Sequence, residues 1–183
     1  MNKNYVTTGK PKTSGAVFRA PIGTTLPTTA KATLDQAFIE LGHISEDGLT
    51  NSNSPSAETI KDWSGQAVLI VSTEKPDTFK LKFIEAANPE VAKGVYGANN
   101  VTVDSTTGYS LAVNANPVEH YSYVFDIALS NGGLRRIVVP DGSITELGDI
   151  VYKFDEAVGY DVTLEALPDA SSNNHYEYTV FAA

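Results

Sequence analysis

The chain has 183 residues, of which 42% are hydrophobic and none is cysteine. This length and composition indicate one domain with a real core, and the lack of cysteine excludes a disulfide framework and a thiolate metal site. The formal net charge of −9 disfavours tight binding to nucleic-acid phosphates. The longest apolar run, at residues 67–71, is too short to cross a bilayer, and the N-terminus lacks the apolar region of a signal peptide. We therefore expect a soluble protein made in a cytoplasm, with no membrane partner.

Charge is unevenly distributed along the chain. Residues 1–34 contain five of the 13 basic residues and none of the 22 acidic ones. This segment is also rich in Thr, Gly and Pro, a composition that buries too little apolar surface to fold alone. We expect residues 1–34 to form an extended basic arm, with a possible first strand at 14–20, and residues 35–183 to form a single acidic β-domain. Complementary charge would steer the arm onto another copy of the body; the alternative is an ordinary solvated tail.

Short strands separated by turns dominate the predicted structure. Residues 66–72 form an apolar run suited to a buried strand, and residues 79–85 alternate between apolar and polar side chains. We expect these two runs to form a hairpin. Further strands are expected at 101–103, 109–113, 119–129, 134–139, 144–154, 160–167 and 176–181, with turns at 131–133 and 140–142. A total of about nine or ten strands predicts an all-β sandwich or barrel.

Helix is expected at two places. Asn88 as N-cap, Pro89 at the first helical position and Gly97 as a stop predict a short helix, which needs Val91 and Val95 packed on the sheet to be stable. A second short helix is favoured by four apolar residues that share one helical face: Leu34, Ala37, Phe38 and Leu41. The predicted fold class is therefore all-β with one or two short helices.

No catalytic constellation is recognisable. The three histidines are isolated in the sequence, and no paired metal-ligand spacing, nucleophile elbow or phosphate-binding loop occurs. Residues 47–53 resemble a calcium loop only superficially, since they lack an acid at every second position and the closing Glu. We predict no catalytic, cofactor-binding or metal-binding residue, and no enzyme activity.

The only tryptophan, Trp63, lies between a loop rich in Ser and Asn and the apolar run at 67–71. A core or corner anchor is the first interpretation, since Trp buries a large area. A contact between subunits is the second, because aromatic residues concentrate in interfaces. The candidates for subunit interfaces are basic residues of the arm, one acid of the polar loop at 42–64, and this Trp: Lys3, Lys10, Lys12, Arg19, Asp47 and Trp63.

Two neighbouring stretches carry a family pattern: LGHISEDGL at 41–49 and ETIKDWSG at 58–65. They are similar to a segment of the form LGyiseDG…ikaWgG in the major tail proteins, or tail tube proteins, of long-tailed bacteriophages of the siphovirus type. One departure is His43, which stands where that family has an aromatic residue. The resemblance covers most of residues 34–170 and continues, in order, at 79–85, 88–97, 134–139, 146–152 and 157–169.

The resemblance implies a structural virion protein with a β-sandwich or barrel and a flanking helix, assembled as hexameric rings that stack into a tube. It implies as partners other copies of the chain, the tape-measure protein, the tail terminator and the distal tail or baseplate proteins, in a virion tail assembled in the host bacterial cytoplasm. Genomic DNA would pass through the lumen without tight binding, so an acidic lining is expected. Candidates for that lining are Glu119, Asp126, Asp161 and Glu165.

A second hypothesis comes from the aromatic content. Nine Tyr and one Trp would supply stacking surfaces for sugars. The protein would then be a β-sandwich virion module that binds a receptor or a carbohydrate. Against this hypothesis, most aromatic residues alternate along strands in the way that core residues do.

Overall fold

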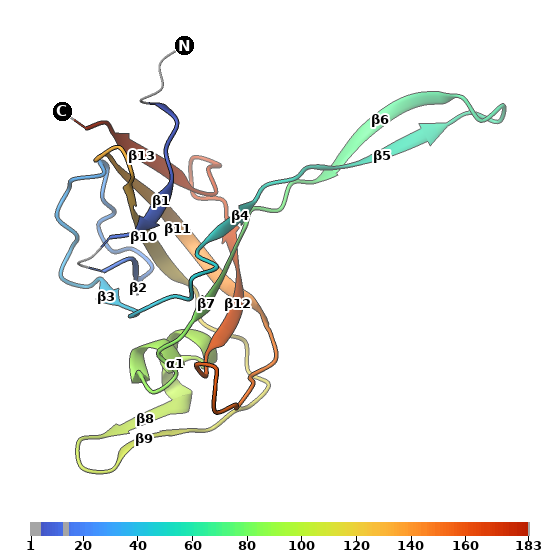
Figure 1. Ribbon diagram of the computed structural model, residues 1–183. Coiled ribbons are helices and arrows are strands. Elements are labelled where there is room, and N and C mark those ends of the chain that lie inside the picture. Colours follow the sequence, from blue (N-terminus) through green and yellow to red (C-terminus); the bar gives the residue numbers. More distant parts are fainter. Residues whose placement is uncertain (1–4, 13–14, 183) are drawn as a thin grey trace.

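The computed structural model describes residues 5–12 and 15–182, and consists mainly of β-strands with one α-helix (Figure 1). The elements are β1 Gly9–Pro11, β2 Val17–Pro21, β3 Ile39–Glu40, β4 Thr50–Ser52, β5 Ser56–Lys61, β6 Ala67–Glu74, β7 Thr78–Phe83, α1 Pro89–Tyr96, β8 Val101–Asp104, β9 Gly108–Leu111, β10 Tyr121–Leu129, β11 Leu134–Leu147, β12 Tyr160–Leu167 and β13 Tyr176–Val180. A single 3-10 turn, Ala98–Asn100, follows the helix.

Two long antiparallel strands, β10 and β11, lie at the centre of the main sheet. On the edge that faces away from β11, β10 pairs with β2 and then with β1. On the edge that faces away from β10, β11 pairs with β12 and β13. The order across the sheet is β3-β2-β10-β11-β12-β7-β4. Two ribbons, β5 with β6 and β8 with β9, stand apart from this sheet.

The main sheet folds over on itself and encloses the core between its two halves. Phe79 on β7 stacks on Phe125 of β10 with ring centroids 5.5 Å apart, although β12 and β11 lie between these strands in the sheet order. The segment from β3 to β4 crosses from the β2 edge to β7, where Ile44 bridges to Phe83. This arrangement confirms the all-β fold as a sandwich, and the sheet does not close into a barrel. Other core side chains are Val17, Leu41, Leu81, Tyr123, Val139, Val162 and Leu164.

The turn between β10 and β11 confirms the Asn-Gly prediction. Gly132 has φ +85°, a conformation that glycine adopts without steric cost. The Asn131 side chain accepts the Gly133 N–H at 3.0 Å. This short turn fixes the register of the two central strands, with Ala128 opposite Leu134.

The turn predicted at 140–142 is wrong. β11 continues through it and ends at Leu147, so the strand expected at 144–154 is only the last part of β11. A register shift between β10 and β11 accommodates Pro140. The Pro140 carbonyl accepts the buried Ser122 hydroxyl at 2.6 Å, which satisfies that hydroxyl inside the sheet.

The helix predicted from Asn88 to Gly97 is confirmed as α1, which lies at one end of the sandwich (Figure 1). The Asn88 side chain accepts the Glu90 N–H at 3.0 Å, as an N-cap does. Val91 and Val95 are buried in the core, as expected. The helix has eight residues, and no helix in the described part of the chain is long and apolar enough to span a membrane.

The helix expected at 34–41 is wrong. The Asp35 carboxylate accepts the Ala37 N–H at 2.9 Å, which makes a local turn where the helix would begin. The chain then joins the sheet as β3, and Leu41 donates its N–H to the Val17 carbonyl at 2.9 Å. The end of this segment thus pairs with the sheet, and the helix that the apolar spacing predicted does not form.

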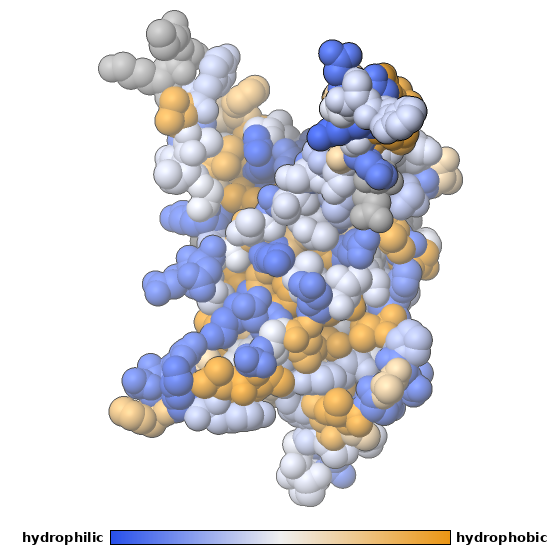
Figure 2. Space-filling view, turned by 90° about the vertical axis from the view of Figure 1, so that its right-hand side faces the viewer, coloured by the Kyte–Doolittle hydropathy of each residue, from blue (hydrophilic) through white to orange (hydrophobic). Residues whose placement is uncertain are grey.

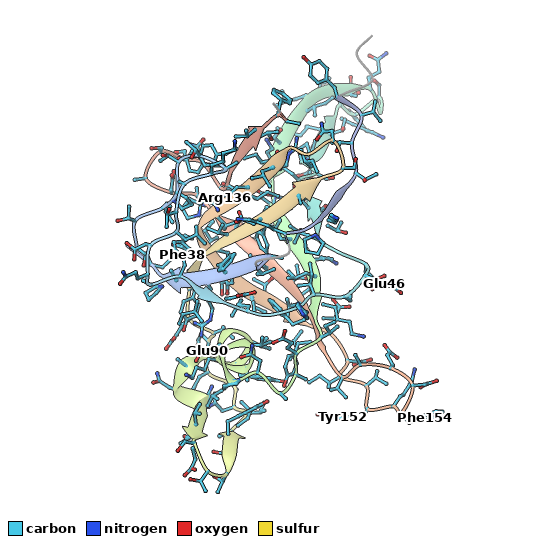
Figure 3. The ribbon with its side chains drawn as sticks, turned by 60° about the vertical axis from the view of Figure 1, so that its left-hand side comes forward. Phe38, Glu46, Glu90, Arg136, Tyr152 and Phe154 are labelled. Atoms are coloured by element: carbon cyan, nitrogen blue, oxygen red, sulfur yellow. The ribbon has the colours of Figure 1, made fainter. Side chains whose placement is uncertain are left out.

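Part of the predicted basic arm lies in the main sheet. β1 and β2 both pair with β10, and Val17 and Ala20 are buried. The long loop after β2 is held on the sheet by Arg136, which donates to the carbonyls of Thr29 at 3.3 Å and Ala32 at 2.6 Å (Figure 3). β2 therefore belongs to the body of the fold, while Lys3 and Ser14 lie outside the described residues.

The hairpin expected between 66–72 and 79–85 is also wrong. β6 pairs with β5, which precedes it, and β7 lies between β4 and β12. The alternation predicted for β7 is confirmed, because Phe79, Leu81 and Phe83 are buried. Residues 67–72 of β6 are instead exposed, so the apolar run is not a buried strand of this protomer.

Glu85 joins α1 to the segment that follows β3. Its carboxylate accepts the Asn88 amide at 3.0 Å and the His43 N–H at 2.9 Å. Gly42, at φ +73°, makes room for that carboxylate, which a Cβ at this position would overlap. The two donors, Asn88 first, hold the pKa of Glu85 below its usual range. Their contribution to stability is therefore present above the pKa of the unfolded chain and is lost as the pH falls through the folded pKa.

We expect Glu85→Gln to be less stable than the wild type at neutral pH, by up to about 1 kcal/mol because the carboxylate is partly solvated. This difference should shrink as the pH falls from the ordinary Glu pKa of about 4.3 through the lower pKa that Glu85 has in the folded protein. Urea unfolding at several pH values measures both effects. Glu46→Gln removes an exposed carboxylate (Figure 3) and should match the wild type throughout. A Glu85→Gln difference that does not change with pH would contradict the prediction.

Candidate assembly surfaces

The most prominent surface feature is the hairpin of β5 and β6, which projects from the body (Figure 1). It leaves the sheet after β4 and returns at β7, and all side chains at 50–72 are exposed. Ile70, for example, is 68% exposed. Figure 2, in which the hairpin points toward the viewer, shows apolar surface on it. Its large exposed apolar residues are Ile60, Trp63, Val68, Leu69, Ile70 and Val71.

Cross-strand pairing places apolar side chains on both faces of this hairpin. Ile60 lies opposite Leu69 on one face, and Thr59 lies opposite Ile70 on the other. A strand that is apolar on both faces usually lies inside a protein, where other elements cover both of its faces. Among the described residues nothing covers either face of the hairpin. The strand β6 therefore has the composition of an interior strand but lies at an exposed position.

The hairpin ends in an ordered turn that displays Trp63. The Asp62 carboxylate accepts the N–H groups of Ser64 and Gln66, both at 2.9 Å, and the Ser64 hydroxyl at 2.6 Å. These donors, the Ser64 hydroxyl first, lower the pKa of Asp62, so the tip keeps its negative charge at neutral pH. Trp63 is 106% exposed, and its interpretation as a core anchor is therefore wrong.

The root of the hairpin is fixed by a buried carboxylate. Asp77 is 1% exposed, accepts the Asn51 amide at 2.8 Å and pairs with Nδ1 of His175. Asn51 lies on β4 and Asp77 directly precedes β7, so this bond joins the two legs of the hairpin. His175 comes from the loop before β13 and packs edge-on against Phe79, with ring centroids 5.3 Å apart. Contacts within the protomer therefore set the direction in which the hairpin leaves the body.

A second exposed apolar surface lies on the loop at 148–159. Tyr152 and Phe154 extend away from the body (Figure 3), and Phe154 is 102% exposed. The loop is anchored by Glu156, whose carboxylate lies 2.8 Å from the Lys82 ammonium. That lysine, more than the neighbouring Lys153, lowers the pKa of Glu156. The loop is thus attached to the body by this ion pair and exposes two aromatic rings to solvent.

Four of the predicted interface residues lie at the surface. Lys10 and Lys12 are at and just after β1, Asp47 is exposed between β3 and β4, and Trp63 is at the hairpin tip. Within one protomer the structure does not bring Trp63 together with the two lysines, because the hairpin extends away from the body (Figure 1). Their role in subunit contacts stays a prediction.

Two predicted site residues are buried inside the protomer, contrary to what a surface role requires. Arg19 is 4% exposed and donates to the Glu90 carboxylate on α1 at 3.0 Å (Figure 3). Asp126 accepts both donors of the Arg136 fork, at 2.6 and 2.7 Å. Each therefore has its charge partner within the fold, Arg19 holding the helix and Asp126 holding the arginine that positions the loop after β2.

The remaining lumen candidates are at or near the surface. Asp161 and Glu165 share the outer face of β12, where Asp161 lies opposite Lys82 of β7. Glu119 precedes β10 and accepts the Tyr121 hydroxyl at 2.5 Å. The structure thus brings two of the four candidates together, on a face that carries both signs of charge.

The sequence-based reasoning did not identify β6 or the loop at 148–159 as surfaces. One signal marks β6: two strand-like runs flank a five-residue segment, DWSGQ at 62–66, and a short Gly-containing connection of this kind is typical of a hairpin. No local signal marks the loop, because the exposure of Tyr152 and Phe154 depends on where β11 ends.

The three histidines occupy separate places. His43 is exposed, His120 pairs with Asp141 at 2.8 Å, and His175 belongs to the hairpin root. Within the described ranges, no group of three His, Asp or Glu side chains is placed to hold a metal ion. Each histidine is thus accounted for by its own local contacts.

An all-β sandwich that exposes clusters of large apolar side chains on a projecting hairpin and on one loop has the surface of a protein that contacts other chains. A family model described as phage tail tube protein matches residues 1–180. The chain therefore belongs to the phage tail tube protein family, whose members are structural components of the virion tail.

No curated protein sequence matches the chain. A chain in the cryo-EM structure of an extracellular contractile injection system, described as the PVC sheath/tube terminator in the extended state, aligns with 92% of this chain and 96% of its own length. The sequence identity is 14% and the TM-score is 0.35.

We expect Asp77→Ala to lower the free energy of unfolding by roughly 2 kcal/mol, because it removes a buried carboxylate that accepts the Asn51 amide and pairs with the partly buried His175. Amide hydrogen exchange should also speed up in β4 and at the start of β7, where the hairpin is rooted. Urea unfolding and exchange mass spectrometry measure the two effects. Asp47→Ala, at an exposed carboxylate, should change stability by less than about 0.5 kcal/mol. A loss below about 1 kcal/mol for Asp77→Ala would show that the root does not depend on this carboxylate.

Proposed function

We propose that this chain is the subunit of hexameric rings that stack into the tail tube of a long-tailed, siphovirus-type phage. The observation that carries the proposal is the β5–β6 hairpin, which is apolar on both faces and exposed in the protomer. Membership of the tail tube family supports the role of tube subunit. Electron microscopy of the assembled protein tests the ring size and the mode of stacking.

The exposure of the hairpin favours assembly because burial of its apolar surface is stabilising. Removing apolar area from water contributes about 25 cal/mol per Å². The hairpin projects from its own body, so another chain must provide the cover (Figure 1). A contact between the hairpin of one copy and the body of the next is heterologous, and its repetition generates closed rings or open stacks.

Further surfaces suit the joining of subunits. The main sheet is open, with the short strands β3 and β4 at its ends, and an open edge can pair with a strand of another chain. The loop with Tyr152 and Phe154 lies near α1, at the end of the body away from the termini (Figures 1 and 3). Exposed apolar groups at separated places are what a subunit with neighbours on several sides requires.

The proposed tube conducts genomic DNA at ejection without binding it tightly. The net charge of −9 supports this role, since a basic lining would hold DNA through counterion release. We keep Glu119, Asp161 and Glu165 as candidates for the lumen and omit Asp126, which is buried. The proposed partners are the tape-measure protein, the tail terminator and the distal tail or baseplate proteins, in a virion tail assembled in the host bacterial cytoplasm.

Two matched variants test the role of the hairpin. Leu69→Lys with Ile70→Lys places charges on both apolar faces of β6, and Thr102→Lys with Val103→Lys adds the same charges to exposed positions on both faces of β8. In negative-stain electron microscopy of the concentrated protein, we expect rings or tubes from the wild type and the second variant, and none from the first. Because all four positions are exposed, both variants should keep wild-type stability within about 0.5 kcal/mol in urea.

Rings and tubes from the Leu69→Lys, Ile70→Lys variant would remove the hairpin from the assembly. Wild-type protein that stays dispersed at low and high salt, and that binds a glycan array, would replace the tube proposal by the receptor- or carbohydrate-binding hypothesis. Ring images from the wild type also count the subunits directly, so any number other than six corrects the ring size.

A further inference from the structure

A groove on the body lies between β1 and the segment at 44–49. It encloses about 270 Å³. Phe125 and Ile127 of β10 line it together with Ile44 and Leu49, so much of its surface is apolar. The groove is at the place where the sheet remains open, between the first strand and the segment that crosses to β4.

The charged groups of the groove leave a free cation beside the apolar lining. Asp126 contributes a carboxylate, but Arg136 neutralises it through two hydrogen bonds, and the Lys12 ammonium is 3.7 Å away. Lys10 also lines the groove and is exposed, and none of the ion pairs formed by the described residues includes it. An occupant with an apolar group and an adjacent negative charge would therefore fit.

The hairpin tip of this same chain has that chemistry. Trp63 presents a fully exposed indole, and burial of such a side chain removes about 150–250 Å² from water. The ionised Asp62 lies directly beside it in an ordered turn, so the tip is already shaped for binding. The hairpin points away from its own body, so its tip lies far from the groove of the same protomer (Figure 1).

We infer that Trp63 of one copy inserts into the groove between β1 and residues 44–49 of the next copy, with Asp62 facing Lys10. The inference rests on the proposed function and specifies the surface that receives the hairpin. Tip and groove are different surfaces, so the contact runs head to tail and each copy is both donor and receiver.

The fluorescence of the single tryptophan reports on this contact. Trp63 emission should be that of an indole in water for the free protomer and should shift to shorter wavelength when rings or tubes form, because the groove is apolar. Trp63→Ala should raise the concentration needed for assembly by about 30-fold or more, as expected for an aromatic anchor at an interface. Since Trp63 is exposed, this variant should retain the wild-type urea midpoint.

Disulfide trapping identifies the receiving surface. The chain has no cysteine, so Gln66→Cys with Pro11→Cys introduces a single tip-and-groove pair that keeps Asp62, Ser64 and Lys10. Oxidation should link copies into a ladder of oligomers on a non-reducing gel. Gln66→Cys with Thr106→Cys, which moves the second thiol to the β8–β9 turn, should give no ladder beyond tip-to-tip dimers.

The outcomes separate this inference from the tube proposal. Tubes that form with unshifted Trp63 emission, or with a ladder from the Thr106→Cys pair instead of the Pro11→Cys pair, would overturn the docking site and leave the tube intact. A ladder from the Pro11→Cys pair together with wild-type protein that forms no ring or tube would support the docking site and overturn the proposed architecture.

Discussion

The antiparallel pairing of β10 with β11 is the interaction on which the rest of the sheet depends. Each of these strands is long enough to carry two partners along its free edge, β2 and β1 on β10, and β12 and β13 on β11. The partners at one end continue into β7, whose Phe79 returns to stack on Phe125 of β10. A single hairpin thus sets the register of both layers, and the short turn at Asn131 and Gly132 sets the register of that hairpin.

The body and the β5–β6 hairpin show two uses of the same kind of sequence. β7 and β12 alternate, and they bury one face against the core of their own protomer. β6 is apolar on both faces and has no such core beside it, so its stabilising contacts are left for other chains to supply. The buried Asp77 ties the two legs of the hairpin together at the root, so the hairpin is a structured element before any partner arrives. Less entropy is then lost on association than for a disordered loop.

The parts of the fold that were predictable are those fixed by local chemistry. Asn88, Pro89 and Gly97 mark the ends of α1, and Asn-Gly marks the central turn, because each of these residues satisfies a nearby backbone requirement. Two predictions failed because another local interaction replaced the expected one. Asp35 makes a turn where a helix was expected, and a register shift lets β11 continue through Pro140 where a turn was expected. The exposure of Trp63 and β6 was not predictable from the apolar pattern, because hydrophobicity shows that a segment needs cover and not which chain provides it. The same limit applies to the candidate site, where the burial of Arg19 and Asp126 depends on partners distant in sequence.

The narrow attachment of the hairpin also has a mechanical consequence. A strand of eight residues spans about 26 Å at roughly 3.3 Å per residue, so the tip is far from the two legs that hold it. A rotation of a few degrees at the legs moves the tip by several times the displacement at the root. In the proposed assembly, subunits linked through such levers would be able to tilt relative to one another while each tip contact stays closed. The bending stiffness of an assembly built in this way is therefore governed by the short β4–β7 pairing, and not by the tightly packed sandwich.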